Sequence, residues 1–283
     1  MVVLWKFNQV NLQIIIMKKT IFQGIITIAL FFSTWFVLTQ IDWVTIFKVK
    51  KVTDKNEEKL GKLFWEIFQK TEKENKNPIL VNSVDSIVSK ICTSNNIERG
   101  LIKVHLLEKE EINAFALPNG HLIVYTGLIL NSENQEELSG VICHEIAHIR
   151  LNHVMKKLVK EIGLSVIISM TTGNGGTETI KQAAKMLSSS AFDRSLEKEA
   201  DITAVDYLLH SKINPEPFAN FLYKLSKKEN ETSKYLTWIS THPESKERAE
   251  YIIEYSKDKK AKYESILCND TWDKMKKEIR ELQ

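Results

Sequence analysis

Cysteine, glycine and proline are scarce in this chain of 283 residues, and each scarcity excludes a class of protein. The three cysteines, Cys92, Cys143 and Cys268, lie far apart, and no Cys-x-x-Cys pair occurs. An odd number cannot all pair within one chain, so we interpret them mainly as small buried apolar residues, with a Cys92–Cys268 disulfide as the alternative. Ten glycines and five prolines are too few for long disordered linkers.

Clustered positive charge is also absent. The chain has 39 Lys and Arg against 36 Asp and Glu, a net charge of +3, and the basic residues are spread along it. A nucleic-acid-binding surface requires Lys and Arg gathered on one face, so no nucleic-acid partner is expected. The hydrophobic share of 43% and the charged share of 27% are those of a globular protein with one substantial domain.

One long uncharged run is present near the N-terminus, at residues 21–39. A helix of this length spans roughly 28 Å, close to the thickness of the hydrocarbon core of a bilayer. The alternatives are a buried core helix and a cleaved signal peptide. A signal peptide would have a shorter apolar region and a small-residue cleavage site, which residues 40–44 do not offer. We therefore predict one uncleaved transmembrane anchor at 21–39, preceded by a cytoplasmic segment at 1–20.

The residues that flank this run bear on its start and its orientation. Met17 precedes Lys18 and Lys19, a typical beginning for an anchored protein, so we hypothesise that translation starts there and that residues 1–16 are an upstream extension. Lysines at positions 48, 50 and 51 follow the run, so the positive-inside rule does not decide the orientation. We expect the N-terminus inside and the rest of the chain on the extracytoplasmic side, periplasmic or extracellular.

Residue patterning beyond the anchor predicts an α+β domain that is mainly helical. Apolar residues recur at helical spacing within 55–76, 81–94, 136–161, 196–210, 218–228 and 245–283. A β-rich run at 102–107, and a strand, Pro-Asn-Gly turn and second strand within 113–126, predict a small sheet. We place the folded domain at 52–260 and a charged C-terminal helix at 261–283.

The motif that carries chemistry is His-Glu-x-x-His at 144–148. Residues four apart share one face of a helix, so His144 and His148 could bind one Zn²⁺ at about 2.0–2.1 Å. Glu145 could then act as general base on a zinc-activated water, as in zincins. The alternative is a solvated helix face with two ordinary histidines. His153 is expected on another side of the same helix, as a structural or exposed residue.

A catalytic zinc site needs a third protein ligand and one open position. Glu197 and Asp201 are four apart, so one carboxylate could reach the metal while the other fixes a ligand histidine. Taken alone, such a segment is more often a solvated charged helix. Its position downstream of the His-Glu-x-x-His motif, and the small Ala200 that permits close helix packing, favour the ligand interpretation.

Four segments, in this order, resemble the HtpX and CAAX prenyl protease family of zinc metallopeptidases, which are gluzincins. The segments are NAFALPNGHLIVYTGLI, HEIAH, DRSLEKEAD and STHPESKER. The chain has one span and no helical-repeat tail, so it is most similar to the BepA- or Oma-like members with a compact catalytic domain. The resemblance implies a zincin-like metallopeptidase domain and a zinc metalloendopeptidase, without the several spans of prenylated-peptide proteases.

The resemblance also implies a role for each matching residue of the metal site. His144, His148 and Glu197 match the zinc ligands of the family, and Glu145 matches its catalytic base. Asp201 matches an acidic residue that supports the site. One zinc ion per chain is therefore expected.

Further roles follow from the outer segments. His242 matches a histidine near the catalytic centre, which would stabilise the oxyanion or block the metal in a latent state. Arg248 matches a nearby arginine. Asn113, Ala114 and Phe115 match an edge strand that pairs with an extended substrate backbone.

Two functions from different classes remain open. The first is a membrane-anchored endopeptidase for quality control, which hydrolyses unfolded or misassembled polypeptides. The alternative is a metal-bound chaperone or assembly factor with latent proteolysis. An anchored structural protein without enzymatic activity would require four ordered motifs to be coincidental.

Overall fold

The computed structural model describes residues 2–40, 49–227, 238–259 and 262–282, with side chains described for 17–36 and from residue 56 onwards within these ranges. The chain divides into two compact units, Met1–Asp54 and Lys55–Gln283. The lysine at position 48, which bears on the predicted orientation, lies outside the described residues.

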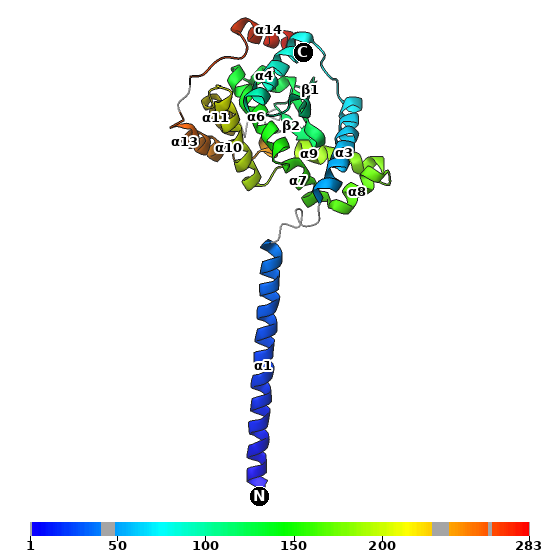
Figure 1. Ribbon diagram of the computed structural model, residues 1–283, viewed down its shortest axis with the longest axis vertical. Helices are drawn as coiled ribbons and strands as arrows, with labels where there is room; N and C mark the ends of the chain where they lie inside the picture. Colours follow the sequence, from blue (N-terminus) through cyan, green and yellow to red (C-terminus); the bar gives the residue numbers. More distant parts are fainter. Residues whose placement is uncertain (1, 41–48, 228–237, 260–261, 283) are drawn as a thin grey trace. The chain divides into compact units, whose positions relative to one another are not determined.

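The first unit contains one long helix, α1 (Val2–Gln40), drawn in dark blue in Figure 1. Its stretch Met17–Phe36 is the one part of the described chain that is long and apolar enough to cross a membrane, and none of it is buried. The predicted anchor at 21–39 lies within this helix. The helix itself starts far earlier than the predicted segment, at Val2.

The second unit is mostly helical around a three-stranded sheet, which confirms the predicted α+β class. Strand β1 (Lys103–Leu107) pairs in parallel with β3 (His121–Tyr125), and β2 (Ala114–Leu117) pairs antiparallel with β3. The sheet order is therefore β1-β3-β2, with β2 at an edge. The turn between β2 and β3 has left-handed backbone at Asn119 and Gly120, the residue types that adopt it most readily.

Helices α3 (Val49–Thr71) and α4 (Pro78–Ser94) lead into the sheet, and α5 (Thr126–Asn131) and α6 (Gln135–Arg150) follow it, with the His-Glu-x-x-His motif on α6. The Asn77 side chain caps α4 by accepting the Ile79 N–H at 2.9 Å. Proline suits the first position of a helix because that N–H needs no partner within the helix.

The single helix predicted for 136–161 is wrong. The chain breaks after α6, and α7 (His153–Ile162) starts afresh. The break lies at Asn152, whose backbone is left-handed with φ of 58°, a conformation that asparagine tolerates because its short side chain can hydrogen-bond locally.

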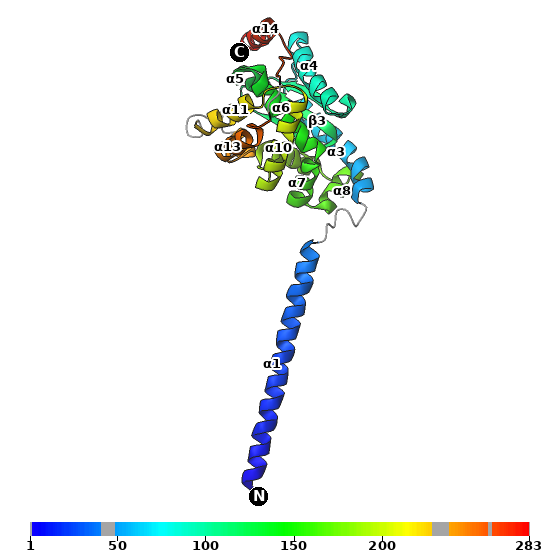
Figure 2. The same cartoon turned by 60° about the vertical axis from the view of Figure 1, so that its left-hand side comes forward.

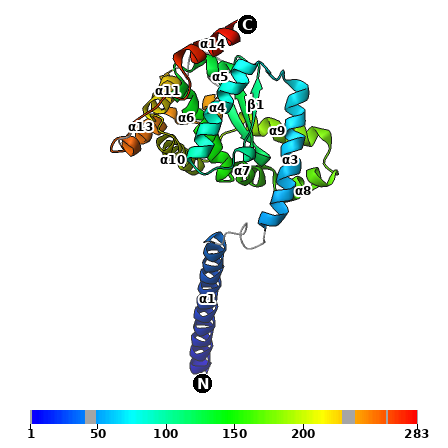
Figure 3. The same cartoon turned by 45° about the horizontal axis from the view of Figure 1, so that its top comes forward.

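The remaining helices in the described part of this unit follow in sequence order. They are α8 (Leu164–Thr172), α9 (Thr177–Ser189), α10 (Arg194–His210), α11 (Glu216–Lys227), α13 (Ser245–Ser256) and α14 (Asn269–Arg280). The predicted C-terminal helix at 261–283 is thus shorter than expected. Figures 1, 2 and 3 show α14 and α8 at opposite ends of this unit, with α6 in its interior.

Close packing against α6 sets the position of the motif. Helices α10 and α11 both pack against α6. A Cβ added at Gly140 of α6 would come within 2.4 Å of the Phe218 side chain on α11, so only glycine permits this approach. All three cysteines are free, with Cys92 and Cys143 buried and Cys268 exposed; the alternative Cys92–Cys268 disulfide is not formed.

Candidate metal centre and active site

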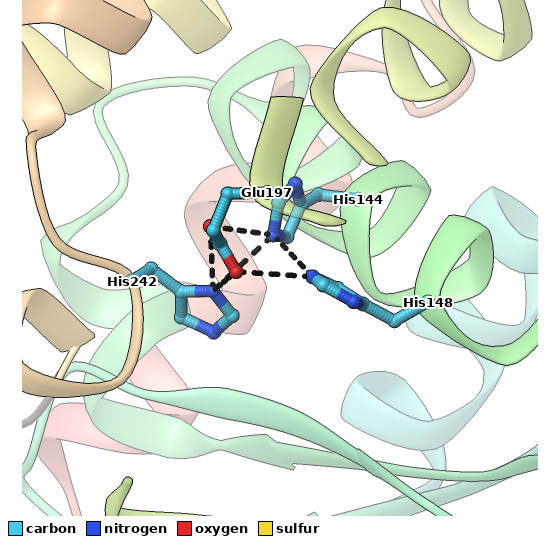
Figure 4. A group of neighbouring side chains, drawn as sticks. All are labelled: His144, His148, Glu197 and His242. Carbon is cyan, nitrogen blue, oxygen red and sulfur yellow. Dashed lines mark hydrogen bonds and ion pairs between the residues drawn. The ribbon is translucent and has the colours of Figure 1, made fainter. Parts of the chain in front are cut away.

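Four buried side chains converge at the centre of the second unit (Figure 4). Helix α6 contributes His144 and His148, α10 contributes Glu197, and the segment before α13 contributes His242. Each offers one donor atom, and these atoms all lie within 4.8 Å of one another. The structure therefore brings together residues that are up to 98 positions apart in sequence.

The donor atoms face one another closely. The Nε2 atoms of His144 and His148 are 2.9 Å apart. Glu197 places Oε1 at 3.3 Å from His148 Nε2 and Oε2 at 3.6 Å from His144 Nε2. Ligands bound to one tetrahedral ion at about 2.0–2.1 Å lie roughly 3.3 Å from each other.

The chemistry of the donor set fits a metal ion. Two imidazole nitrogens and one carboxylate oxygen form the ligand set of several catalytic zinc sites. Burial, then the neighbouring His144, lowers the pKa of His148 well below its ordinary value, which keeps this imidazole neutral and able to bind a cation. Burial would raise the pKa of Glu197, but Arg248, His242 and His144 hold it well below the usual range, so the carboxylate stays ionised.

Glu145 follows His144 on α6 and is fully buried. Neither of its carboxylate oxygens accepts a hydrogen bond of ordinary geometry from a described residue, although His242 Nε2 lies 3.3 Å from Oε1. Burial, then the charge of Glu197, raises the pKa of Glu145 well above its ordinary value. A bound cation would act in the opposite direction. A buried carboxylate beside a metal-binding group is placed to accept a proton.

An ion pair supports the site from behind His144. Asp201 on α10 accepts from His144 Nδ1 at 2.8 Å and from Nε and Nη2 of Arg248, each at 2.8 Å. Tyr251 also donates its hydroxyl to Asp201. Burial would raise the pKa of Asp201, but Arg248 and His144 keep it well below its usual range. A permanently ionised carboxylate therefore fixes the ring of His144.

His242 offers a fourth donor atom to the same buried group. Its Nδ1 lies 3.0 Å from Glu197 Oε1 and 3.3 Å from His144 Nε2. Burial lowers the pKa of His242 to about 4, so the ring is neutral at physiological pH. Trp238 stacks on it with ring centroids 4.1 Å apart.

The three residues predicted to bind substrate lie at the edge strand. Asn113 directly precedes β2, while Ala114 and Phe115 form its first half. The carboxamide atoms of Asn113 are buried and have no hydrogen-bond partner in the described part of the chain. Helices α6 and α9 both pack against β2, so all of its residues are buried.

Besides Trp238, sequence reasoning missed His153 and Phe192, which contact the donor group. The expectation that His153 lies apart from it is wrong, because its Nδ1 lies 3.0 Å from His148 Nδ1. Phe192 stacks on His148 with ring centroids 4.0 Å apart. Asn152 tolerates the left-handed backbone found there, but this residue type alone does not place His153 beside His148. Phe192 had no signal in the sequence.

Comparison with known proteins agrees with this geometry. The family model described as Peptidase family M48 matches residues 78–256. Metalloprotease LoiP of Escherichia coli (strain K12) is 30% identical over 56% of this chain and 64% of its own length. The beta-barrel assembly-enhancing protease of Yersinia pestis is 25% identical over 59% of this chain and 37% of its own length.

A third relative, the mitochondrial metalloendopeptidase OMA1 of Schizosaccharomyces pombe (strain 972 / ATCC 24843), is 26% identical over 60% of this chain and 51% of its own length. The matches span less than two thirds of each of these relatives. The family match confirms the predicted resemblance and the metallopeptidase class. The chain belongs to peptidase family M48.

Proposed function

We propose that this chain is a membrane-anchored zinc metalloendopeptidase that hydrolyses peptide bonds in unfolded or misassembled proteins. The observation that carries the proposal is the buried donor group of His144, His148 and Glu197, with Glu145 beside it. Residues 52–260 would form the catalytic domain and residues 261–283 a charged C-terminal extension.

In this proposal His144, His148 and Glu197 hold one zinc ion. Zinc would supply Lewis-acid polarisation of the peptide carbonyl and activation of the attacking water. Asp201 holds the ring of His144 through the 2.8 Å contact to Nδ1, and Arg248 balances the charges of Asp201 and Glu197.

Glu145 serves as the general base. Its burial next to His144 places its carboxylate to accept a proton from the attacking water. It takes the proton of the attacking water and passes it to the leaving amine. His242 is the residue that either stabilises the oxyanion or keeps the site latent, and its place among the donor atoms favours latency in the resting state.

Substrate would bind as an added strand along β2. An extended backbone can pair with an edge strand, and among the described strands β2 has a partner on one side only. Asn113 would offer its buried carboxamide to the substrate backbone, and Ala114 and Phe115 would supply main-chain groups.

The substrate class and the location follow from two further observations. The names of the relatives describe proteases, one of which enhances β-barrel assembly, and a protease that acts in assembly meets incompletely folded chains. The helix at Met17–Phe36 would be a single-pass anchor, with the catalytic domain on the extracytoplasmic side. The alternative, a chaperone with latent proteolysis, is not favoured by these names.

The test is casein cleavage by the full chain in detergent, with bound zinc quantified and Glu145→Gln as the variant. The expected result is one zinc per chain in both proteins and cleavage in the wild type alone. Glu136→Gln, in the first turn of the same helix, is the matched control and keeps its activity. Full cleavage by Glu145→Gln would remove Glu145 as the base, and wild-type protein that cleaves casein without bound zinc would refute the proposed zinc dependence.

A further inference from the structure

We infer that His153 and Glu199 position the metal-ligand imidazole of His148, as Asp201 and Arg248 position that of His144. This inference rests on the proposed role of His148 as a zinc ligand. It gives the middle glutamate of the Glu-x-Glu-Ala-Asp segment at 197–201 a function that neither the motif nor the resemblance assigns.

The contacts form a continuous chain of three groups. His148 Nδ1 lies 3.0 Å from His153 Nδ1, and both residues are fully buried. The far nitrogen of His153, Nε2, lies 3.2 Å from Glu199 Oε2. Glu199 is the outermost member, with its side chain 51% exposed. This series of side-chain contacts therefore leads from the metal site to the protein surface.

The break between α6 and α7 makes this arrangement possible. On one continuous helix, residues five apart lie about 140° apart around the axis, since each residue turns the helix by about 100°. Left-handed Asn152 ends α6 and redirects the chain. His153 thereby becomes the first residue of α7 and turns its ring back onto His148.

The proton positions on His148, His153 and Glu199 are consistent with one another. His148 faces the metal donors with Nε2, so a metal bound there requires the proton of the ring on Nδ1. That N–H donates to His153 Nδ1, which must then be unprotonated. Neutral His153 carries its proton on Nε2 and donates it to Glu199 Oε2. Each group thus has one donor facing one acceptor.

Each ligand histidine therefore has a carboxylate that orients its ring, but the two carboxylates act through different contacts. His144 Nδ1 faces a fully buried carboxylate directly, whereas His148 Nδ1 faces a carboxylate through one intervening imidazole. Outer partners of this kind fix the tautomer and the ring orientation of a metal ligand. His153 and Glu199 are positioning residues and do not touch the substrate.

The first test measures zinc affinity of the full chain in detergent by competition with a chelator. His153→Phe keeps a planar ring but removes the acceptor for His148 Nδ1–H, and we expect zinc affinity to fall about 10–100-fold. His153→Asn places a carbonyl oxygen two bonds from Cβ, as Nδ1 is, and should restore most of the loss. His210→Phe, at an exposed histidine near the end of α10, is the matched control.

The second test substitutes the half-exposed Glu199, where a change leaves the core intact. Glu199→Ala should lower zinc affinity and change the visible spectrum of the Co²⁺-substituted protein, since the ring of His148 loses its fixed orientation. Glu250→Ala, an exposed glutamate on α13, should change neither. Circular dichroism verifies that each variant is folded.

The outcomes separate this inference from the proposed function. Wild-type affinity in folded His153→Phe and Glu199→Ala, with an unchanged Co²⁺ spectrum, would overturn the positioning role while zinc binding by the wild type still stands. Equal losses in His153→Phe and His153→Asn would also overturn it, because the lost hydrogen-bond acceptor would not be the cause. A wild type that binds no zinc would instead refute the proposed function.

Discussion

Arg248 and Asp201 form a two-pronged buried ion pair, with both nitrogen–oxygen distances at 2.8 Å. The remaining guanidinium nitrogen, Nη1, lies 2.7 Å from Glu197 Oε2. One cation therefore balances the carboxylate that fixes a ligand histidine and the carboxylate that faces the metal site. All three side chains are almost fully buried, so water does not screen their charges.

Removal of this cation should destabilise the fold. Arg248→Met leaves two buried carboxylates without a counter-charge, and breaking a buried pair typically costs about 3–5 kcal/mol. Chemical unfolding followed by circular dichroism measures the loss. Arg150→Met, at an exposed arginine of α6, should cost far less. A loss of under about 1 kcal/mol in Arg248→Met would mean that the two carboxylates take up protons instead.

Glu197→Ala should weaken zinc binding more than the loss of any outer partner does. The substitution removes one of three proposed protein ligands, whereas outer partners account for about 10–100-fold in affinity. Chelator competition measures the change. Glu247→Ala, at an exposed glutamate of α13, provides the control. Unchanged zinc affinity in Glu197→Ala would show that Glu197 is not a ligand.

His242→Ala should raise the rate of casein cleavage several-fold. The Nδ1 atom of His242 lies among the metal donors, where it competes with water and substrate for the open position that catalysis requires. Initial rates at equal zinc occupancy measure the effect. A fall of about 10²–10³-fold would instead assign His242 to oxyanion stabilisation, since that is the usual loss for one such donor.

The stability of the protein should depend on pH through Lys157. Its Nζ donates to the Ser190 carbonyl and lies 4.1 Å from the centre of the Phe192 ring. Burial lowers its pKa from 10.5 to about 8. Between these values the unfolded chain binds a proton that the folded chain does not, so stability rises with pH across this window.

The corresponding experiment compares melting temperatures of the wild type and Lys157→Met from pH 7 to pH 10.5. Relative to the variant, the wild type should gain stability above pH 8, by roughly 3 kcal/mol at most. Lys156→Met, at the exposed neighbouring lysine, should show the pH profile of the wild type. A constant difference between wild type and Lys157→Met across the range would contradict the lowered pKa.

Much of the fold could be predicted from local patterns. The periodicity of apolar residues indicated the helices, and the Pro-Asn-Gly turn indicated the hairpin of β2 and β3, because both patterns depend on neighbours in sequence. The break at Asn152 could not be predicted in this way. Its left-handed backbone accompanies the packing of α7 against α6, a contact that the residues around Asn152 do not reveal by themselves.

The sequence by itself determined the chemical class of the protein. The spacing of the His-Glu-x-x-His motif and of the downstream carboxylate pair indicated the metal site, and the length of the uncharged run indicated the anchor. Only the tertiary structure decided which groups meet. It placed His242 among the metal donors, joined His153 and Glu199 to His148, and joined Arg248 to two carboxylates. These contacts depend on the close packing of helices distant in sequence, and no local pattern encodes such packing.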